Sequence, residues 1–167
     1  DPEEVAKIRE TVTGTCGVID VHDLRTRRMA HRVLVDAHVR VDARISVSEG
    51  HRIAELARSR VRAAHPDVLD VLVHVDTEED HVGAIGRMLP GRAALMKELD
   101  EILGKEVPQA APAVFHYMGD QVEAEVYLPF DWCVDSVRLD NLQERVRRRV
   151  EASPCWGRIA LLCRIAP

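Results

Sequence analysis

The chain has 167 residues, of which 46% are hydrophobic, 31% are charged and 4% are aromatic. This length suits one ordinary domain or two small ones, and the core must be aliphatic. The net charge of -5 disfavours a nucleic-acid surface, and no stretch has the roughly 18 uninterrupted apolar residues of a membrane span. The sequence shows no signal peptide, and because it begins at Asp1 we expect a piece of a longer protein.

The first half of the chain predicts the order helix, strand, strand, helix, strand. Residues 26–31 are mostly polar and predict a turn or an irregular extension between the first two strands. The expected elements are a helix over 2–13, a strand over 18–25, a strand over 32–45, a helix from Ser46 or Ser48 to Pro66, and a strand over 68–76.

Alternation along these strands predicts one aliphatic face and one polar face. The residues expected on the aliphatic face are Ile19, Val21, Val33, Val35, Ala37, Val39, Val41, Leu69, Val71, Val73 and Val75. The residues expected on the buried sides of the two helices are Val5, Ile8, Val12, Ile53, Ala57, Val61 and Ala64. The helices must cover the aliphatic face, which gives an α+β fold and leaves the polar face open to water or to a partner.

The second half of the chain repeats this pattern. It predicts a helix carrying Leu95, Leu99, Ile102 and Leu103, strands over 113–118 and about 122–128, a helix from Asp135 or Ser136 to Pro154, and a strand over 156–165. We therefore predict two αββαβ units, residues 1–80 and residues 91–167, joined by a linker over residues 81–90.

Histidines and a carboxylate gather on the open face of the first unit. By parity His22, His38, His74 and Asp76 share that face, and His51 lies in the first turn of the helix after the second strand. Imidazole and carboxylate donors suit zinc, iron, manganese or cobalt, and the two oxygens of Asp76 allow it to bridge two ions. The competing interpretation is that these are solvated histidines on a polar sheet face.

The same residues resemble a known family. Val18-Ile-Asp-Val-His22-Asp-Leu-Arg25-Thr-Arg27, Val35-Asp-Ala-His38-Val, Glu49-Gly-His51 and Val73-His74-Val-Asp76 are similar to the cytoplasmic C-terminal domain of cation diffusion facilitators, which are proton-coupled divalent-metal exporters. The resemblance covers residues 2–80 and implies a metallochaperone-like (ferredoxin-like) fold that forms a homodimer and binds metal at the dimer interface. It also implies one site of His22, His38 and Asp76 and a second of His51, His74 and Asp76.

This resemblance implies a cytosolic regulatory, metal-sensing and dimerisation domain of a divalent-cation efflux transporter. Its partners would be a second copy and the transmembrane domain of the same protein, at the cytoplasmic side of the cell membrane. Zn²⁺ is the first expectation for the metal, with Fe²⁺, Mn²⁺ or Co²⁺ as alternatives, in a site of one or two ions. The alternative function is a stand-alone ferredoxin-like interaction or small-molecule-binding module without metal. No arrangement of residues suggests an enzyme.

The second unit departs from the ligand pattern. Leu162 and Arg164 stand where His74 and Asp76 would be, and a guanidinium there would repel a divalent cation. Leu139 or Asp140 stands in place of His51, Glu125 lies near the His38 position, and His116 matches His22. We therefore predict a degenerate copy without a metal site, which packs on the first unit as a pseudo-dimer or extends the dimer.

Three further features are predicted to be unremarkable. The arginine run Arg145, Arg147, Arg148 and Arg149 indicates a solvated helix face rather than a nucleic-acid patch. His81, beside Glu78 and Asp80, is either an auxiliary ligand or part of a mobile linker. The cysteines Cys16, Cys133, Cys155 and Cys163 have no regular spacing, so we expect reduced thiols that pack in the core or a loop, with one pair meeting in space left open.

Overall fold

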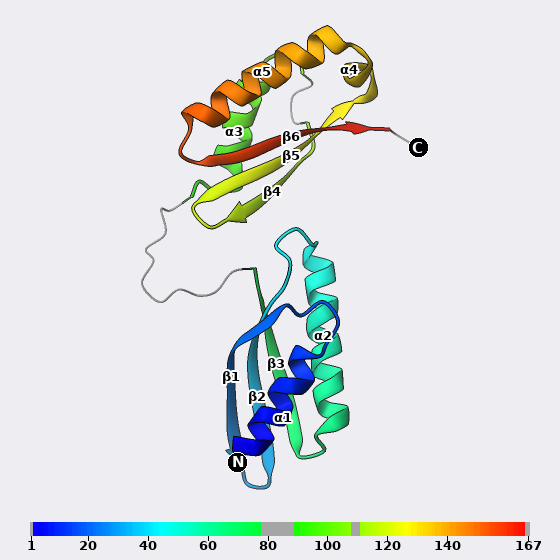
Figure 1. Ribbon diagram of the computed structural model, residues 1–167, viewed down its shortest axis with the longest axis vertical. Helices are drawn as coiled ribbons and strands as arrows, with labels where there is room; N and C mark the ends of the chain where they lie inside the picture. The colour runs from blue at the N-terminus through cyan, green and yellow to red at the C-terminus, as the bar shows by residue number, and fades with distance from the viewer. Residues whose placement is uncertain (1, 78–88, 108–110, 166–167) are drawn as a thin grey trace. The chain divides into compact units, whose positions relative to one another are not determined.

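The computed structural model describes residues 2–77, 89–107 and 111–165. The chain divides into two compact units, Asp1–Val82 (unit 1) and Gly83–Pro167 (unit 2) (Figure 1). His81 and most of the linker predicted over residues 81–90 lie outside the described residues. Among the described residues, every helix is too short or too polar to cross a lipid bilayer.

Each unit folds as αββαβ, which confirms the predicted fold class. Unit 1 contains α1 (Pro2–Thr13), β1 (Asp20–Met29), β2 (Arg32–Arg40), α2 (Val47–Ala64) and β3 (Val68–Asp76). Unit 2 contains α3 (Arg92–Leu103), β4 (Ala113–Met118), β5 (Gln121–Pro129), the short α4 (Phe130–Val134), α5 (Ser136–Ala152) and β6 (Trp156–Arg164). In both three-stranded sheets the first two strands pair antiparallel and the last two pair parallel.

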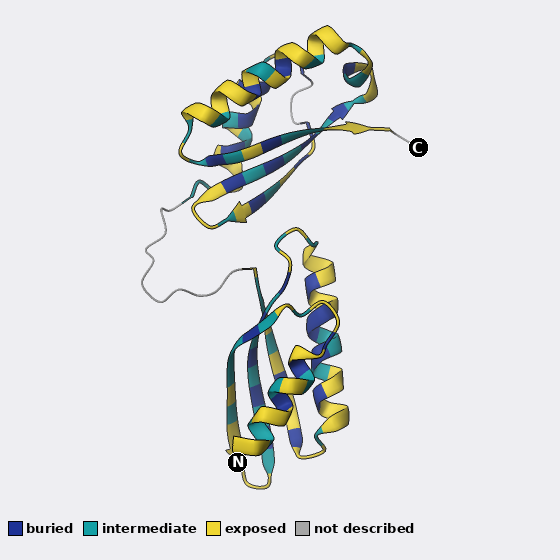
Figure 2. Cartoon of the chain, in the orientation of Figure 1, coloured by how far each residue is buried: buried dark blue, intermediate teal, exposed yellow. Residues whose placement is uncertain are grey.

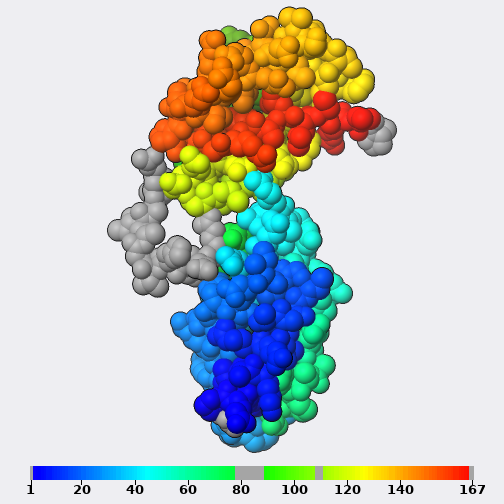
Figure 3. Space-filling model, viewed as in Figure 1, coloured from blue at the N-terminus to red at the C-terminus, as the bar shows by residue number. Residues whose placement is uncertain are grey.

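The helices cover one face of each sheet, and the buried residues lie between the two layers (Figure 2). In β2 the buried residues alternate strictly, as predicted, because one face of a strand presents every second side chain. Ser46 caps α2 by accepting a hydrogen bond from the Glu49 backbone N at 3.1 Å. The space-filling view shows α1 (dark blue) and α5 (orange) on the outside of their units (Figure 3). Ala64 was expected in the buried stripe of α2 but is exposed, so that prediction was wrong.

Two β-bulges change the predicted parity. In β1 the pairing passes from Val21 with Val39 to Asp23 with His38, so His22 is the extra residue. In β3 the extra residue is Leu69, which is 44% exposed and does not join the core as predicted. A bulge adds one unpaired residue and shifts the facing of those beyond it, which sequence alternation alone does not reveal.

The two ends of β1 also differ from the prediction. Ile19 was expected in the core but precedes the strand and is 57% exposed. The segment predicted as a turn or irregular extension is mostly strand, because β1 continues to Met29 and pairs there with Arg32. The turn is limited to the next two residues, with Ala30 at a positive φ of 54°.

We expected reduced cysteines and left open that one pair meets in space, and the structure has one such pair. Cys133 of α4 and Cys163 of β6 form a disulfide with their Cα atoms 6.0 Å apart. Cys155 packs at the edge of the unit 2 core, whereas Cys16 is exposed rather than in the core.

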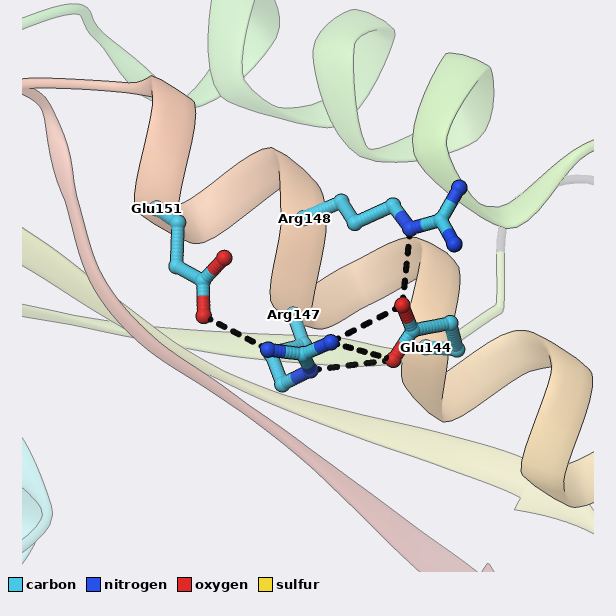
Figure 4. Close-up of polar contacts among 4 residues, drawn as sticks. All are labelled: Glu144, Arg147, Arg148 and Glu151. Carbon is cyan, nitrogen blue, oxygen red and sulfur yellow. Dashed lines mark hydrogen bonds and ion pairs between the residues drawn. The ribbon is translucent and has the colours of Figure 1, made fainter.

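The arginine run of α5 is an ion-pair network (Figure 4). Arg147 and Arg148 both donate to the carboxylate of Glu144, at distances down to 2.7 Å, and Arg147 also reaches Glu151 at 2.9 Å. Hydrogen bonds from Arg147 and then Arg148 hold the pKa of Glu144 below its ordinary value. The other two arginines of the run also pair with acids, Arg145 with Glu106 and Arg149 with Glu98. Positive charge on this face is therefore paired within the unit, which supports the solvated-face interpretation.

Gly17 is required where α1 turns toward β1. Its φ is +90°, and an added Cβ would lie 2.6 Å from Ile53 Cδ1 in the buried layer. We expect Gly17→Ala to destabilise unit 1 by about 1–3 kcal/mol, measured by urea unfolding. Gly119→Ala in unit 2 is the matched control. Gly119 also has a positive φ of +63°, but a Cβ added there would meet no atom within 4 Å. Equal losses at the two sites would contradict the role of the Ile53 contact.

Candidate metal centre

Three strands bring His22, His38 and Asp76 together on the open face of the unit 1 sheet. His38 Nδ1 lies 2.9 Å from Asp76 Oδ2, and His22 Nε2 lies 3.3 Å from the same oxygen. One donor atom from each of the three residues lies within 4.8 Å of the other two. Two imidazoles and one carboxylate at this spacing form a chelating set for a divalent transition metal.

The β1 bulge explains how a histidine and an acid can both avoid the core. Because the bulge places two residues opposite one, both His22 and Asp23 face the side that carries His38, while Leu24 returns to the hydrophobic layer. Asp23 was not among the predicted ligands, and its carboxylate forms an ion pair with Arg25 at 2.9 Å. The sequence carries no signal for its placement, because the placement depends on the bulge.

The burial of His22 suits a metal ligand. Its side chain is 16% exposed, and both ring nitrogens are enclosed without a hydrogen-bond partner among the described residues. An enclosed polar atom that lacks a partner is costly, so such atoms are rare unless an ion or a water satisfies them. The Asp76 and His38 side chains are 25% and 29% exposed, which leaves a route for an ion from solvent.

The other two predicted ligands, His74 and His51, are not among the three donors that meet. The ring of His74 stacks on that of His38, with centroids 4.4 Å apart and planes at 13°, and its side chain is exposed. His51 is exposed on the first turn of α2 and lines a pocket of about 350 Å³ with Val73 and Val75, on the helical side of the sheet. Within one chain, His51 and His74 therefore face opposite sides of the sheet.

Unit 2 carries different residues at the corresponding strand positions. The register puts Tyr127 at the His38 position, Leu162 at the His74 position and Arg164 at the Asp76 position. The predicted match of His116 with His22 is wrong. His116 pairs with Glu123, which stands at the Leu34 position, and Leu34 pairs with Arg27. His116 therefore corresponds to Arg27. Glu125 corresponds in the same way to Asp36 rather than to His38, and counting from the helix caps puts Asp140 at the His51 position. The absence of a metal site in unit 2 stays a prediction.

Comparison with known proteins assigns the first unit. Residues 1–78 match the family described as cation efflux protein, cytoplasmic domain. Metal tolerance protein C1 of Arabidopsis thaliana is 35% identical over 74 residues, which are 44% of this chain and 16% of that protein. The cation-efflux pump FieF of Shewanella oneidensis is 37% identical over 59 residues, 35% of this chain and 20% of that protein. The chain therefore spans a fifth or less of the length of these two relatives.

A solved structure also aligns with part of the chain. A MamM CTD variant in its manganese form is 23% identical, covering 46% of this chain and 98% of that chain with a TM-score of 0.45. The family match and the relatives agree on the segment that holds the His22, His38 and Asp76 cluster. Residues 1–78 of this chain are therefore similar to the cytoplasmic domains of cation efflux proteins.

Proposed function

We propose that unit 1 binds a divalent transition metal through His22, His38 and Asp76, and that it is the cytosolic regulatory and dimerisation domain of a divalent-cation efflux transporter. The observation that carries this proposal is the convergence of both imidazoles on one carboxylate oxygen, with the ring nitrogens of His22 otherwise unpartnered. The matched family and the names of the relatives support a role in cation efflux rather than in catalysis.

The protein's part in binding is to hold three donors on three different strands. When bound, the cation would supply positive charge that neutralises the Asp76 carboxylate and joins β1, β2 and β3. The backbone ladder fixes the spacing of the three strand positions, so little backbone entropy is lost on binding. Zinc is the metal we expect, and iron, manganese and cobalt accept the same nitrogen and oxygen ligands.

A second site would need a second copy of the chain. His74 and Asp76 are on the open face, while His51 is on the helical side of the same sheet. Because these donors cannot meet within one chain, we propose that His51 of one copy approaches His74 and Asp76 of the other in a homodimer. Asp76 would then be shared by the two sites.

This arrangement would couple metal concentration to dimer geometry. A cation that binds the closed dimer more tightly than the open one shifts the population toward the closed form by its difference in affinity. We propose that the transmembrane domain of the same protein, which would lie in the membrane, responds to that shift. The chain would lie at the cytoplasmic side of the membrane.

Zinc is expected to stabilise unit 1 against heat. At a free concentration about 100 times the Kd, binding adds about 2.7 kcal/mol, which for a unit of this size corresponds to roughly 10 °C or more in Tm. The measurement is differential scanning calorimetry with zinc and with a chelator, on the wild type, on His38→Ala and on His31→Ala. His31 is the matched control because it is exposed in the β1–β2 turn, away from the cluster.

We expect His31→Ala to respond to zinc as the wild type does and His38→Ala to lose most of the shift. Sedimentation of the same samples tests whether zinc also promotes the dimer. A wild type that shows no metal-dependent shift would instead favour the interaction module without metal. An equal shift in His38→Ala would place the metal elsewhere.

A further inference from the structure

Unit 2 holds a pair of sulfur atoms that the proposed function does not use. Cys133 lies on α4 and Cys163 near the end of β6, 30 residues apart in sequence, and the disulfide joins them with a Cα–Cα distance of 6.0 Å. Cys163 is exposed and Cys133 is half-buried, so a small reagent can reach the bond from solvent. The other two cysteines, Cys16 and Cys155, are not in a disulfide.

The two elements that carry this pair lie at the edge of the unit 2 core, where Cys133 is only partly buried. α4 is a single turn of five residues without a side-chain cap; its buried residue is Trp132, and Phe130 and Val134 are 55% and 67% exposed. The end of β6 is exposed from Leu162 onward. The sulfur atoms need to separate from about 2.0 Å in a disulfide to about 3.8 Å across a tetrahedral ion with metal–sulfur bonds of about 2.3 Å.

The pair is specific to unit 2. The register aligns Cys163 with Val75, and counting back from the helix caps aligns Cys133 with Arg44. The unit that matches the cation efflux family therefore has no sulfur at either position. A function of this pair does not involve the nitrogen and oxygen donors of unit 1, and it is independent of the proposed function.

We propose that Cys133 and Cys163 form a redox-gated chelating site for a soft, thiophilic cation such as Cd²⁺ or Cu⁺. In the oxidised chain the disulfide leaves no thiolate, so the site is closed. Two molecules of a low-molecular-weight thiol open it: they supply two electrons and two protons, become a disulfide themselves, and leave two cysteine thiols. A divalent cation then forms two metal–sulfur bonds and releases the two thiol protons to solvent.

The test is a Cd²⁺ titration of the full chain, oxidised and thiol-reduced, followed by the ultraviolet charge-transfer absorption of thiolate-bound cadmium. Imidazole and carboxylate ligands in unit 1 do not give this signal. The matched variants each remove two of the four cysteines: Cys133→Ser with Cys163→Ser removes the pair, and Cys16→Ser with Cys155→Ser keeps it. We expect about one absorbing Cd²⁺ per chain in the reduced wild type and in the variant that keeps the pair, and none in the oxidised wild type.

Loss of the absorption in the variant that lacks the pair, with far-ultraviolet circular dichroism unchanged, supports the site. Absorption that persists in this variant would overturn it, and so would a reduced wild type without absorption. If the variant does not fold, protection of Cys133 and Cys163 from alkylation by Cd²⁺ in the reduced wild type decides instead. A disulfide that excess thiol does not reduce in the folded chain would show a purely structural bond and would also overturn the proposal.

Discussion

Replacing Asp76 by asparagine is expected to lower the affinity of unit 1 for zinc by about 100-fold or more. Asp76 Oδ2 is the atom on which His22 and His38 converge, at 3.3 and 2.9 Å. Asparagine keeps the size of the side chain and an oxygen that accepts a hydrogen bond from His38, but it loses the negative charge that attracts a cation. The fold should therefore persist while binding is lost, and isothermal titration with zinc measures the difference.

Asp36→Asn is the matched control for this experiment. Asp36 lies on the same face of β2 as His38 and pairs with Arg27 at 3.2 Å, apart from the donor cluster. The Asp36→Asn substitution removes one negative charge from the same sheet face, so it controls for general electrostatic attraction of the cation. Equal zinc affinity in the wild type and in Asp76→Asn would contradict the proposed site. Equal losses of zinc affinity in Asp76→Asn and Asp36→Asn would show that only net charge matters.

Trp156→Ala is expected to destabilise unit 2 by about 3–5 kcal/mol. Trp156 is 1% exposed and its ring lies 6.2 Å from that of Phe115, so alanine would leave a large cavity in the core. Urea unfolding followed by circular dichroism measures the loss. The unit 1 transition should not move, because each hydrophobic cluster of the described residues draws on one unit alone.

Trp156→Phe is the control that separates volume from hydrogen bonding. The indole Nε1 of Trp156 is buried without a hydrogen-bond partner among the described residues. Phenylalanine removes that unsatisfied donor and most of the volume stays filled, so we expect a smaller loss than for alanine. A loss as large as that of Trp156→Ala would indicate that Nε1 has a partner, such as a bound water.

The elements were predictable because their signals are local. The helix caps, the α2 stripe and the alternation of β2 each depend on residues within a few positions of one another. The structure has them as expected except for Ala64 at the end of the stripe. The bulges at His22 and Leu69 were not predictable, since one extra residue leaves no mark in composition. The parity argument still put His22 on the open face, because a bulge residue there has the same facing as an ordinary outward one.

The long-range errors have a different cause. The Cys133–Cys163 bond joins residues 30 apart, and spacing alone does not identify which segments the fold brings together. His116 was matched to His22 because both are histidines on the first strand of their unit, but the register places it elsewhere.

All three residues of the proposed metal site precede unit 2 in the chain. During synthesis, unit 1 therefore leaves the ribosome first and can complete its own core and donor set while unit 2 is still being translated. Metal available to the nascent chain could then be captured before the remaining strands exist. The order of the two units along the messenger thus favours early maturation of the cluster.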